Sequence, residues 1–318
     1  MSILKHIRIN YINKLIEDLI QKKNFDKLQL EFKDLKKKFP DVYFQSLPKL
    51  IKTLINDPSA DALFNRNLIW INSYHLKDID IIENFLNFYF TNLGINNYNF
   101  SGFQERTSEC LNQYGYSSAV FSFENLIYLN EFIQYEISEN NYDQNIFLKT
   151  NQAFYEQKTF NNYFLYNNLT RCYFYIIRNP IDIYFELSES NDEKAPDMIF
   201  NHTSHIEKVG KFQIQDGSQS WKVNAESWTN ENVKSTFNGM IINYEELINN
   251  PLEIFTSVIG HLNQSGLDVS LNYSIMENFI DENQNLFSEM KPKPTISNQK
   301  LKIFKRECGI LADKYGFF

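Results

Sequence analysis

A buried strand that ends in arginine is the feature of this sequence that points most directly to chemistry. Residues 172–177 are apolar, aromatic and β-branched without alternation, which is typical of a strand buried on both faces of a parallel sheet. Arg178 follows directly. Asn179 suits a helix cap, Pro180 the first helical position and Asp182 the first turn. Because ligands of open α/β sheets bind at the carboxyl ends of strands, the guanidinium is well placed to bind a phosphate through paired charge-assisted bonds.

An earlier stretch has the same strand-turn-helix pattern. Residues 68–74 predict a strand, and residues 79–93 predict a helix with one apolar face. Strand, short turn and helix form the first unit of a doubly wound fold. The turn between them contains His75 and Lys77 together with Asp78 and Asp80. We therefore expect an α/β protein with a parallel sheet flanked by helices, in which Lys77 and Arg178 lie near the same edge.

Further blocks follow in order and complete a resemblance. Residues 145–151 read as a buried strand ending in Lys149, Thr150 and Asn151, two tryptophans stand at 221 and 228, and Tyr244–Pro251 reads as a helix after a strand. With the segment around Arg178, these blocks resemble the PAPS-dependent sulfotransferases over residues 67–318. The resemblance implies a P-loop-like doubly wound sheet, the nucleotide PAPS (3′-phosphoadenosine 5′-phosphosulfate) as cofactor, no metal, and transfer of a sulfuryl group to a hydroxyl of a sugar or small molecule.

The resemblance also implies which residues would bind the nucleotide. Arg178 takes the place of the arginine that grips the 3′-phosphate, and Lys77 lies in the turn that binds the phosphosulfate. Trp221 and Tyr244 match nucleotide-side positions of the family, and Glu186 replaces a serine that assists the arginine. Lys149 is either an anion-binding lysine or a surface lysine at the end of a strand.

Several positions depart from the family in ways that affect chemistry. The turn after the first strand lacks glycine, and Asp78 and Asp80 would neutralise the positive helix N-terminus there. Two like unit charges about 4 Å apart repel by about 4 kcal/mol at an effective dielectric constant of ~20. We favour the interpretation of Asp78 as an ordinary helix cap over that of a modified phosphate cradle.

The catalytic position and the serine position are altered as well. Asn151 stands where the family has its catalytic histidine, and an amide cannot act as a general base. Losing a positioned base costs about 10²–10⁴-fold in rate, so His75 or Glu156 would have to replace it. A carboxylate accepts hydrogen bonds and donates none. Glu186 is therefore predicted to form an internal salt bridge that occupies Arg178.

These features leave two functional hypotheses open. The first is a divergent sulfotransferase. The second is a catalytically inactive protein of the same fold, a pseudoenzyme, that acts as a binding or scaffold module. For Trp221 and Trp228, core packing is favoured over a direct role. His202 and His205 are interpreted as surface residues, because no third metal ligand accompanies them.

Residues 1–66 predict a helical hairpin extension before the α/β domain of residues 67–318. Residues 23–41 weakly resemble half of a tetratricopeptide repeat, but they occur once, and such arrays need about three copies. A hairpin packed on the main domain is therefore favoured over a peptide-binding array, and a protein partner is conceivable for these helices. Lys36, Lys37 and Lys38 are interpreted as a solvated helix end.

Composition narrows the class of protein. The chain has 318 residues, of which 43% are hydrophobic and 16% aromatic, which suffices for a large core. A net charge of −8 argues against nucleic-acid binding. The three cysteines are widely spaced, which predicts no disulfide framework. With neither a long apolar run nor a signal-peptide pattern in the sequence, we expect no membrane contact and a cytoplasmic location.

Overall fold

The structure is a computed structural model. It describes residues 3–55, 57–117, 126, 129–154, 156–157, 162–188, 199, 220–287 and 296–318. The chain forms two compact units. Unit 1 comprises Met1–Asn67, Phe103–Gln144 and Glu156–Thr170, and unit 2 comprises Leu68–Gly102, Asn145–Tyr155 and Arg171–Phe318. The first transition between the units falls after Asn67, and two later segments also belong to unit 1.

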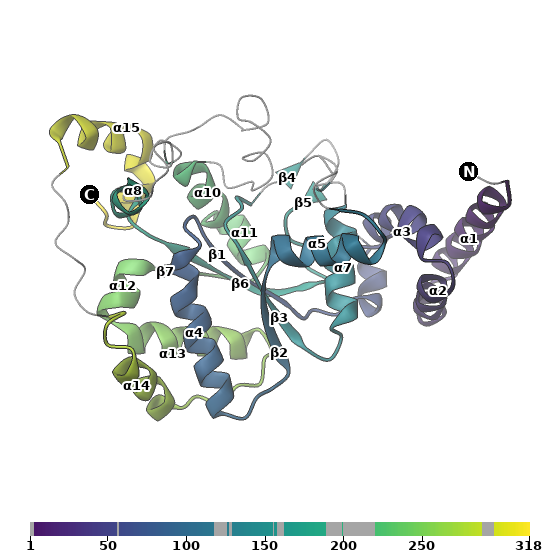
Figure 1. Ribbon diagram of the computed structural model, residues 1–318, viewed down its shortest axis with the longest axis horizontal. Helices are drawn as coiled ribbons and strands as arrows, with labels where there is room; N and C mark the ends of the chain where they lie inside the picture. Colours follow the sequence, from purple (N-terminus) through teal and green to yellow (C-terminus); the bar gives the residue numbers. More distant parts are fainter. Residues whose placement is uncertain are drawn as a thin grey trace. The chain divides into compact units, whose positions relative to one another are not determined.

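Unit 2 is built on a five-stranded sheet in which all strands run parallel (Figure 1). Its strands are β1 (Leu68–Ser73), β2 (Tyr98–Gly102), β3 (Asn145–Thr150), β6 (Thr170–Ile177) and β7 (Gly239–Asn243). They lie in the order β2-β3-β1-β6-β7. The predicted parallel α/β sheet is therefore confirmed. The sequence did not predict β2, whose half-buried residues at the sheet edge show no long apolar run.

The central strands explain why the unbroken apolar runs were informative. Every residue of β1 is buried, and β6 is buried throughout except Arg171. Leu68 pairs with Ile146 of β3, and Tyr173 pairs with Gly239 of β7. Gly239 is needed at this place, because a Cβ atom there would lie 2.2 Å from the ring of Tyr173.

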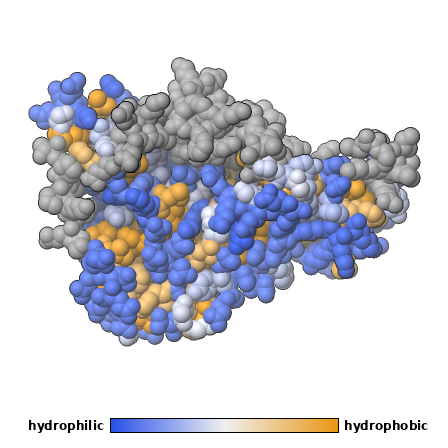
Figure 2. Space-filling view, viewed as in Figure 1, coloured by the Kyte–Doolittle hydropathy of each residue, from blue (hydrophilic) through white to orange (hydrophobic). Residues whose placement is uncertain are grey.

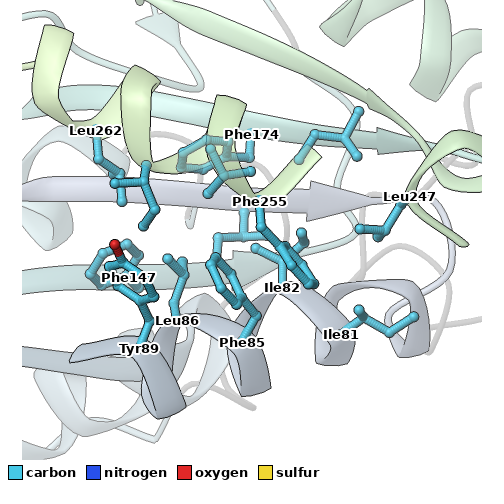
Figure 3. Close-up of a cluster of buried hydrophobic side chains, with 14 of the residues drawn as sticks. Ile81, Ile82, Phe85, Leu86, Tyr89, Phe147, Phe174, Leu247, Phe255 and Leu262 are labelled. Carbon is cyan, nitrogen blue, oxygen red and sulfur yellow. The ribbon is translucent and has the colours of Figure 1, made fainter. Parts of the chain in front are cut away.

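Helices cover the sheet and bury its side chains. The core of one layer combines α4 (Lys77–Asn92), α13 (Pro251–Gln264) and α14 (Tyr273–Glu282) with the sheet. Figure 3 shows the side chains of α4 and α13 that meet over the sheet. Phe85 of α4 stacks on Phe255 of α13 with ring centroids 3.8 Å apart, and Phe279 of α14 meets both rings edge-on. The predicted apolar face of the helix after the first strand is thus the face that packs here.

The further helices of unit 2 lie between β6 and β7 or follow β7. They are α8 (Pro180–Ser188), α10 (Trp221–Trp228), α11 (Glu231–Thr236), α12 (Tyr244–Asn249) and α15 (Asn298–Lys314). Side-chain caps fix where several of them begin. Asn243 accepts from two backbone N–H groups of α12, and Ser220 and Ser297 cap α10 and α15.

Unit 1 consists mainly of helices. They are α1 (Ile3–Gln21), α2 (Phe25–Lys38), α3 (Pro40–Leu54), the 3-10 helix η1 (Pro58–Leu63), α5 (Phe103–Gln113) and α7 (Asn130–Asn140), with a hairpin of β4 (Glu156–Gln157) and β5 (Asn162–Tyr163). The extension was predicted as a hairpin, but residues 3–54 form three helices. Pro40 explains the difference, because it starts a new helix at the end of α2.

A buried carboxylate organises unit 1. Glu136 of α7 is fully buried and accepts hydrogen bonds from Lys36 Nζ at 2.7 Å, Tyr43 Oη at 2.5 Å and Tyr114 Oη at 2.6 Å. These donors come from α2, α3 and the turn after α5. Lys36 was predicted to be solvated. It is instead a partner of this carboxylate, because a buried charge must be paired.

No helix among the described residues has both the length and the apolar character needed to cross a membrane.

Candidate functional site

The candidate site lies where the order of strands in the sheet reverses. From β1 the chain continues to β2 and β3 on one side, and β6 and β7 lie on the other side. The parallel neighbours β1 and β6 therefore end side by side at a topological switch point, which is the usual ligand crevice of an open α/β sheet. His75 and α4 follow β1, and Arg178 and α8 follow β6. The structure thus brings together the two strand-turn-helix segments singled out in the sequence.

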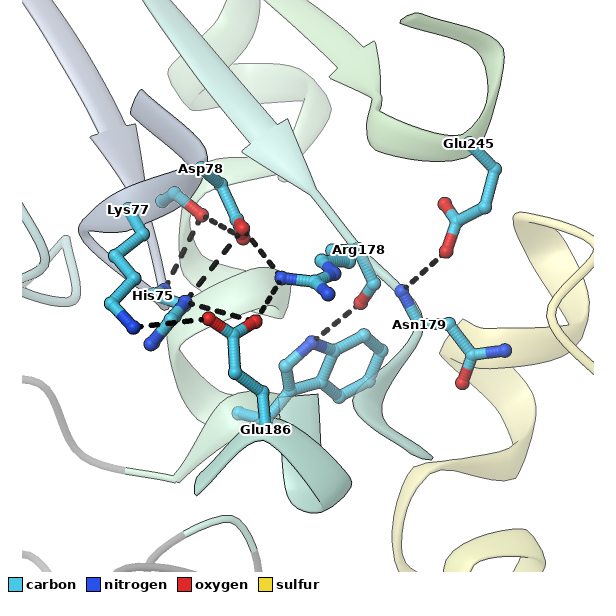
Figure 4. A network of polar contacts seen from close by, with 9 residues as sticks. His75, Lys77, Asp78, Arg178, Asn179, Glu186 and Glu245 are labelled. Carbon is cyan, nitrogen blue, oxygen red and sulfur yellow. Dashed lines mark hydrogen bonds and ion pairs between the residues drawn. The ribbon is translucent and has the colours of Figure 1, made fainter. Parts of the chain in front are cut away.

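Arg178 is held by two carboxylates (Figure 4). Its Nη1 donates to Asp78 Oδ1 at 2.8 Å and to Glu186 Oε2 at 2.8 Å. The ring of Tyr244 lies under the guanidinium, with Arg178 Cζ 4.6 Å from the ring centroid. Arg178 Nε is buried and makes no hydrogen bond with the residues that the structure describes. The predicted salt bridge with Glu186 is therefore present, and a second one with Asp78 accompanies it.

Asp78 is a buried partner of Arg178, so its favoured interpretation as a helix cap is wrong. The N-cap of α4 is Leu76, which makes no side-chain cap bond, and Asp78 lies inside the first turn. Its side chain is 1% exposed and accepts a hydrogen bond from Ser73 Oγ at 3.1 Å. A capping carboxylate usually stays in contact with water, but this one points toward the guanidinium across the sheet. Asp80, by contrast, is exposed.

Glu186 contacts residues that follow both strands, Lys77 after β1 and Arg178 after β6. It lies on α8, and its Oε1 accepts from Lys77 Nζ at 3.3 Å. His75 Nδ1 is 3.9 Å from Glu186 Oε2 and 3.7 Å from Asp78 Oδ1. Lys77, His75, Asp78, Arg178 and Glu186 therefore form one network, which we call the Arg178 latch.

The charges of the latch balance internally. Two cations, Lys77 and Arg178, face two carboxylates, Asp78 and Glu186. Burial by itself lowers the pKa of Arg178, but Asp78, Tyr244 and Glu186 outweigh it and raise this pKa above its ordinary value. Burial likewise raises the pKa of Glu186, but Arg178, His75 and Lys77 lower it overall. Each charged form is thus stabilised by its neighbours.

The other predicted anion-binding cation is paired as well. Lys149, on β3, donates from Nζ to Glu83 Oε2 of α4 at 2.6 Å. Their side chains are 28% and 18% exposed. Sequence reasoning missed Glu83, although its place on the helix after the altered turn was a usable signal. Lys149 and Arg178 are therefore both paired with carboxylates.

An uncharged network surrounds the position of the expected catalytic histidine. Asn224 Nδ2 donates to the backbone carbonyl of Asn151 at 2.7 Å, and Asn224 Oδ1 accepts from Tyr175 Oη at 3.0 Å. The next carbonyl, that of Gln152, accepts from Asn72 Nδ2 and from the indole of Trp228, both at 2.8 Å. Asn224 and Trp228 are fully buried. These residues hold the loop after β3 in place but provide no proton acceptor.

Trp221 contacts the backbone of Arg178 rather than its guanidinium. Its indole nitrogen donates to the carbonyl of Arg178 at 3.1 Å, and its side chain is fully buried. Glu245 accepts from the backbone N–H of Asn179 at 3.0 Å, and the Asn179 side chain donates to the carbonyl of Phe317. Arg178 is therefore fixed by its backbone and by its side chain, in agreement with the preferred packing role of Trp221.

The predicted residues fall into two groups. Glu186 and Tyr244 contact the guanidinium of Arg178, Trp221 contacts its backbone carbonyl, and Lys77 joins through Glu186. Lys149 and Asn151 lie at the end of β3 with separate partners. Glu156 belongs to unit 1. His202 and His205 lie outside the described residues. Within the described residues, no group of three or more histidine, cysteine, aspartate or glutamate side chains is arranged to hold a metal ion.

In comparisons with known proteins, no family model and no curated protein matches this sequence.

Proposed function

We propose that this protein is a sulfotransferase-like, P-loop-like α/β protein whose nucleotide site is closed by its own carboxylates, and that it acts as a binding or scaffold module rather than as an enzyme. The observation that carries the proposal is the pairing of Arg178 Nη1 with both Asp78 and Glu186 at 2.8 Å. Charge-assisted bonds are the strong class of hydrogen bond. An incoming phosphate that used Nη1 would have to replace both bonds, and one that used the other nitrogens would lie beside both carboxylates.

The cost of opening the latch supports this proposal. An anion at Arg178 would approach the two carboxylates that already bind it. At an effective dielectric constant of ~20, each like-charge contact at about 4 Å costs about 4 kcal/mol. Lys77 offsets only part of this cost, because Glu186 also binds its ammonium group. The internal carboxylates thus occupy the role that the phosphates of a nucleotide would have.

The chemistry beside the latch also favours a non-catalytic role. Sulfuryl transfer to a hydroxyl needs a group that accepts the hydroxyl proton. At the expected position, Asn151 contributes its carbonyl to Asn224 and offers no base. His75 could accept a proton, but its Nδ1 faces Asp78 and Glu186 inside the latch. The competing hypothesis, transfer from PAPS to a sugar or small-molecule hydroxyl, therefore lacks a placed base among these residues.

A groove in unit 1 supports a role in binding a partner protein. The helices α1 and α2 enclose a groove of about 370 Å³. It is lined mainly by apolar side chains, those of Tyr11, Ile12, Leu15, Ile16, Leu35 and Phe39, with Glu31 and Asp34 beside them. Tyr11 is 70% exposed. This groove supports the idea that the N-terminal helices bind a protein partner through an apolar side chain.

Thermal unfolding with 3′-phosphoadenosine 5′-phosphate tests the closure. We expect no stabilisation of the wild-type protein by millimolar nucleotide. The double variant Asp78→Ser with Glu186→Ser frees Arg178, and it should be stabilised, by about 2.7 kcal/mol at a ligand concentration of ~100 times the dissociation constant. The matched control is Asp268→Ser with Asp313→Ser, which removes two exposed carboxylates of unit 2 outside the Arg178 latch.

Two outcomes would contradict the proposal. If the wild-type protein is stabilised by the nucleotide and Arg178→Lys abolishes the effect, the site is open and the sulfotransferase hypothesis gains support. Transfer of labelled sulfate from PAPS to hydroxyl acceptors is then the next assay. If the double variant gains nothing more than its control does, the carboxylates are not what closes the site.

A further inference from the structure

Charge is segregated along the C-terminal part of unit 2. From residue 235 to residue 290 the sequence contains eight aspartate and glutamate residues but no lysine or arginine. The helix α15, which follows, carries five lysine and arginine residues against two acidic ones. Such a reversal of sign between neighbouring elements of one chain points to surfaces of opposite charge.

The acidic part contains a groove. Between α13 and α14 lies a hollow of about 860 Å³. Its carboxylates are those of Glu253, Glu277 and Asp281, and its apolar side chains include Leu252, Ile280 and Tyr273. Tyr273 is 51% exposed. Figure 2 shows apolar surface bordered by polar residues in the region of α12 to α14. No ion pair reaches the three carboxylates from the residues that the structure describes.

The basic helix presents a face of matching chemistry. Lys302, Lys305, Arg306 and Ile310 are exposed and follow helical spacing, so they lie on one side of α15. Ile310 is 89% exposed, the largest exposed fraction among the large apolar side chains that the structure describes. Arg306 donates to the neighbouring Glu307, but Lys302 and Lys305 have no ion pair within the described part of the chain.

We propose that the basic face of α15 of one molecule docks in the α13–α14 groove of a second copy of this chain. Lys302 and Lys305 would meet Glu277 and Asp281, and Ile310 would cover the apolar side chains of the groove. Complementary charge increases the association rate and fixes the orientation, and an exposed apolar side chain bordered by charge is typical of an interface. The proposal is independent of the proposed function, because it uses no residue of the Arg178 latch.

The geometry of the contact defines the assembly. Because the groove and the helix are different surfaces, the contact is head-to-tail, and each bound molecule leaves one free groove and one free helix. The assembly therefore grows into chains or closes into a ring as the concentration rises. Its charged contacts are exposed, so they weaken in salt, since the screening length falls from about 10 Å at 0.1 M to about 3 Å at 1 M.

Sedimentation velocity of the full chain tests the proposal. In low salt we expect the wild-type protein to shift to larger species with concentration, and the shift to weaken at least about tenfold in ~1 M salt. A groove variant, Glu277→Gln with Asp281→Asn, and a helix variant, Lys302→Gln with Lys305→Gln, should each be monomeric. The control Glu105→Gln with Asp143→Asn neutralises two exposed carboxylates of unit 1 and should behave like the wild-type protein.

Mixing the two variants gives the decisive result. The helix variant keeps an intact groove, and the groove variant keeps an intact helix, so one functional contact can form between them. An equimolar mixture should therefore contain heterodimers and nothing larger, while circular dichroism shows both variants folded. A wild-type protein that stays monomeric at all concentrations in low salt would overturn the proposal. So would variants that assemble as the wild-type protein does.

Discussion

Replacing Asp78 with asparagine measures how much the Arg178 latch contributes to stability. Asparagine keeps the shape of the side chain but removes its charge. Asp78 is 1% and Arg178 14% exposed, so water cannot replace the lost partner. Removing one partner of a buried ion pair costs about 3–5 kcal/mol. Because Glu186 still binds Arg178 at 2.8 Å, we expect the lower end of this range, about 3 kcal/mol.

Urea unfolding followed by tryptophan fluorescence suits this measurement. The three tryptophans of the chain, at 70, 221 and 228, are buried in unit 2, so their fluorescence reports the unfolding of the unit that contains the latch. A double-mutant cycle with Arg178→Met separates the pair from other effects of each change. A coupling free energy of about 1–3 kcal/mol is expected for such a contact.

The control is Asp80→Asn on the same helix. Asp80 is exposed, so its replacement should change the free energy of unfolding by no more than about 0.5 kcal/mol. If Asp78→Asn costs no more than this control, the latch does not stabilise the fold, and the account of Asp78 as the partner of Arg178 is refuted.

The other predictions concern pH, packing and thiol reactivity. The pKa of Glu186 is lowered in the folded state, so this residue stabilises the fold fully above its unfolded-state pKa. The stabilisation is lost as the pH falls through the folded-state pKa. Glu186→Gln should therefore make the free energy of unfolding fall less steeply at acid pH. Burial raises the pKa of Glu131, so the folded state loses stability as the pH rises above about 4.5, the ordinary pKa of this group. Glu131→Gln should therefore raise the melting temperature more at pH 7 than at pH 4, and equal gains would contradict this. Gly239→Ala should destabilise unit 2 in urea by more than about 1 kcal/mol, because a Cβ atom would lie 2.2 Å from the Tyr173 ring. Burial raises the pKa of the thiol of Cys172 to about 12, so a thiol reagent at pH 8 should label it only in denaturant.

Much of unit 2 could be predicted from the sequence because its signals are local. Unbroken apolar runs indicated β1, β3 and β6, and the spacing of apolar residues indicated α4. The edge strand β2 was missed, since Tyr98–Gly102 is only half-buried and shows no such run. The composition of unit 1 from three separate segments was missed too, because no local pattern reveals which distant helices pack together.

Two parts of the candidate site were predicted from the sequence, the cation Arg178 and the carboxylate of Glu186. The contact between Arg178 and Glu186 was predicted from the family resemblance, in which Glu186 replaces a serine that assists the arginine, and it is present. The role of Asp78 did not, because helix-cap chemistry and a buried ion pair use the same residue type at the same place. Only the packing of β1 beside β6 shows that this carboxylate faces Arg178. The same holds for Asn151 and Asn224, two positions far apart in sequence that meet through one hydrogen bond.

The environment of Glu136 has a consequence for any attempt to shorten this protein. Two of the groups that neutralise or solvate that carboxylate, Lys36 and Tyr43, belong to the N-terminal helices. A chain that began at residue 67 would keep α7 and the charge of Glu136. Of the three donors to this carboxylate, only the hydroxyl of Tyr114 would remain. The helices α2 and α3 are therefore needed by the rest of unit 1. Deleting them should destabilise the part of unit 1 that contains α7, because Glu136 would lose Lys36 as the partner of its charge.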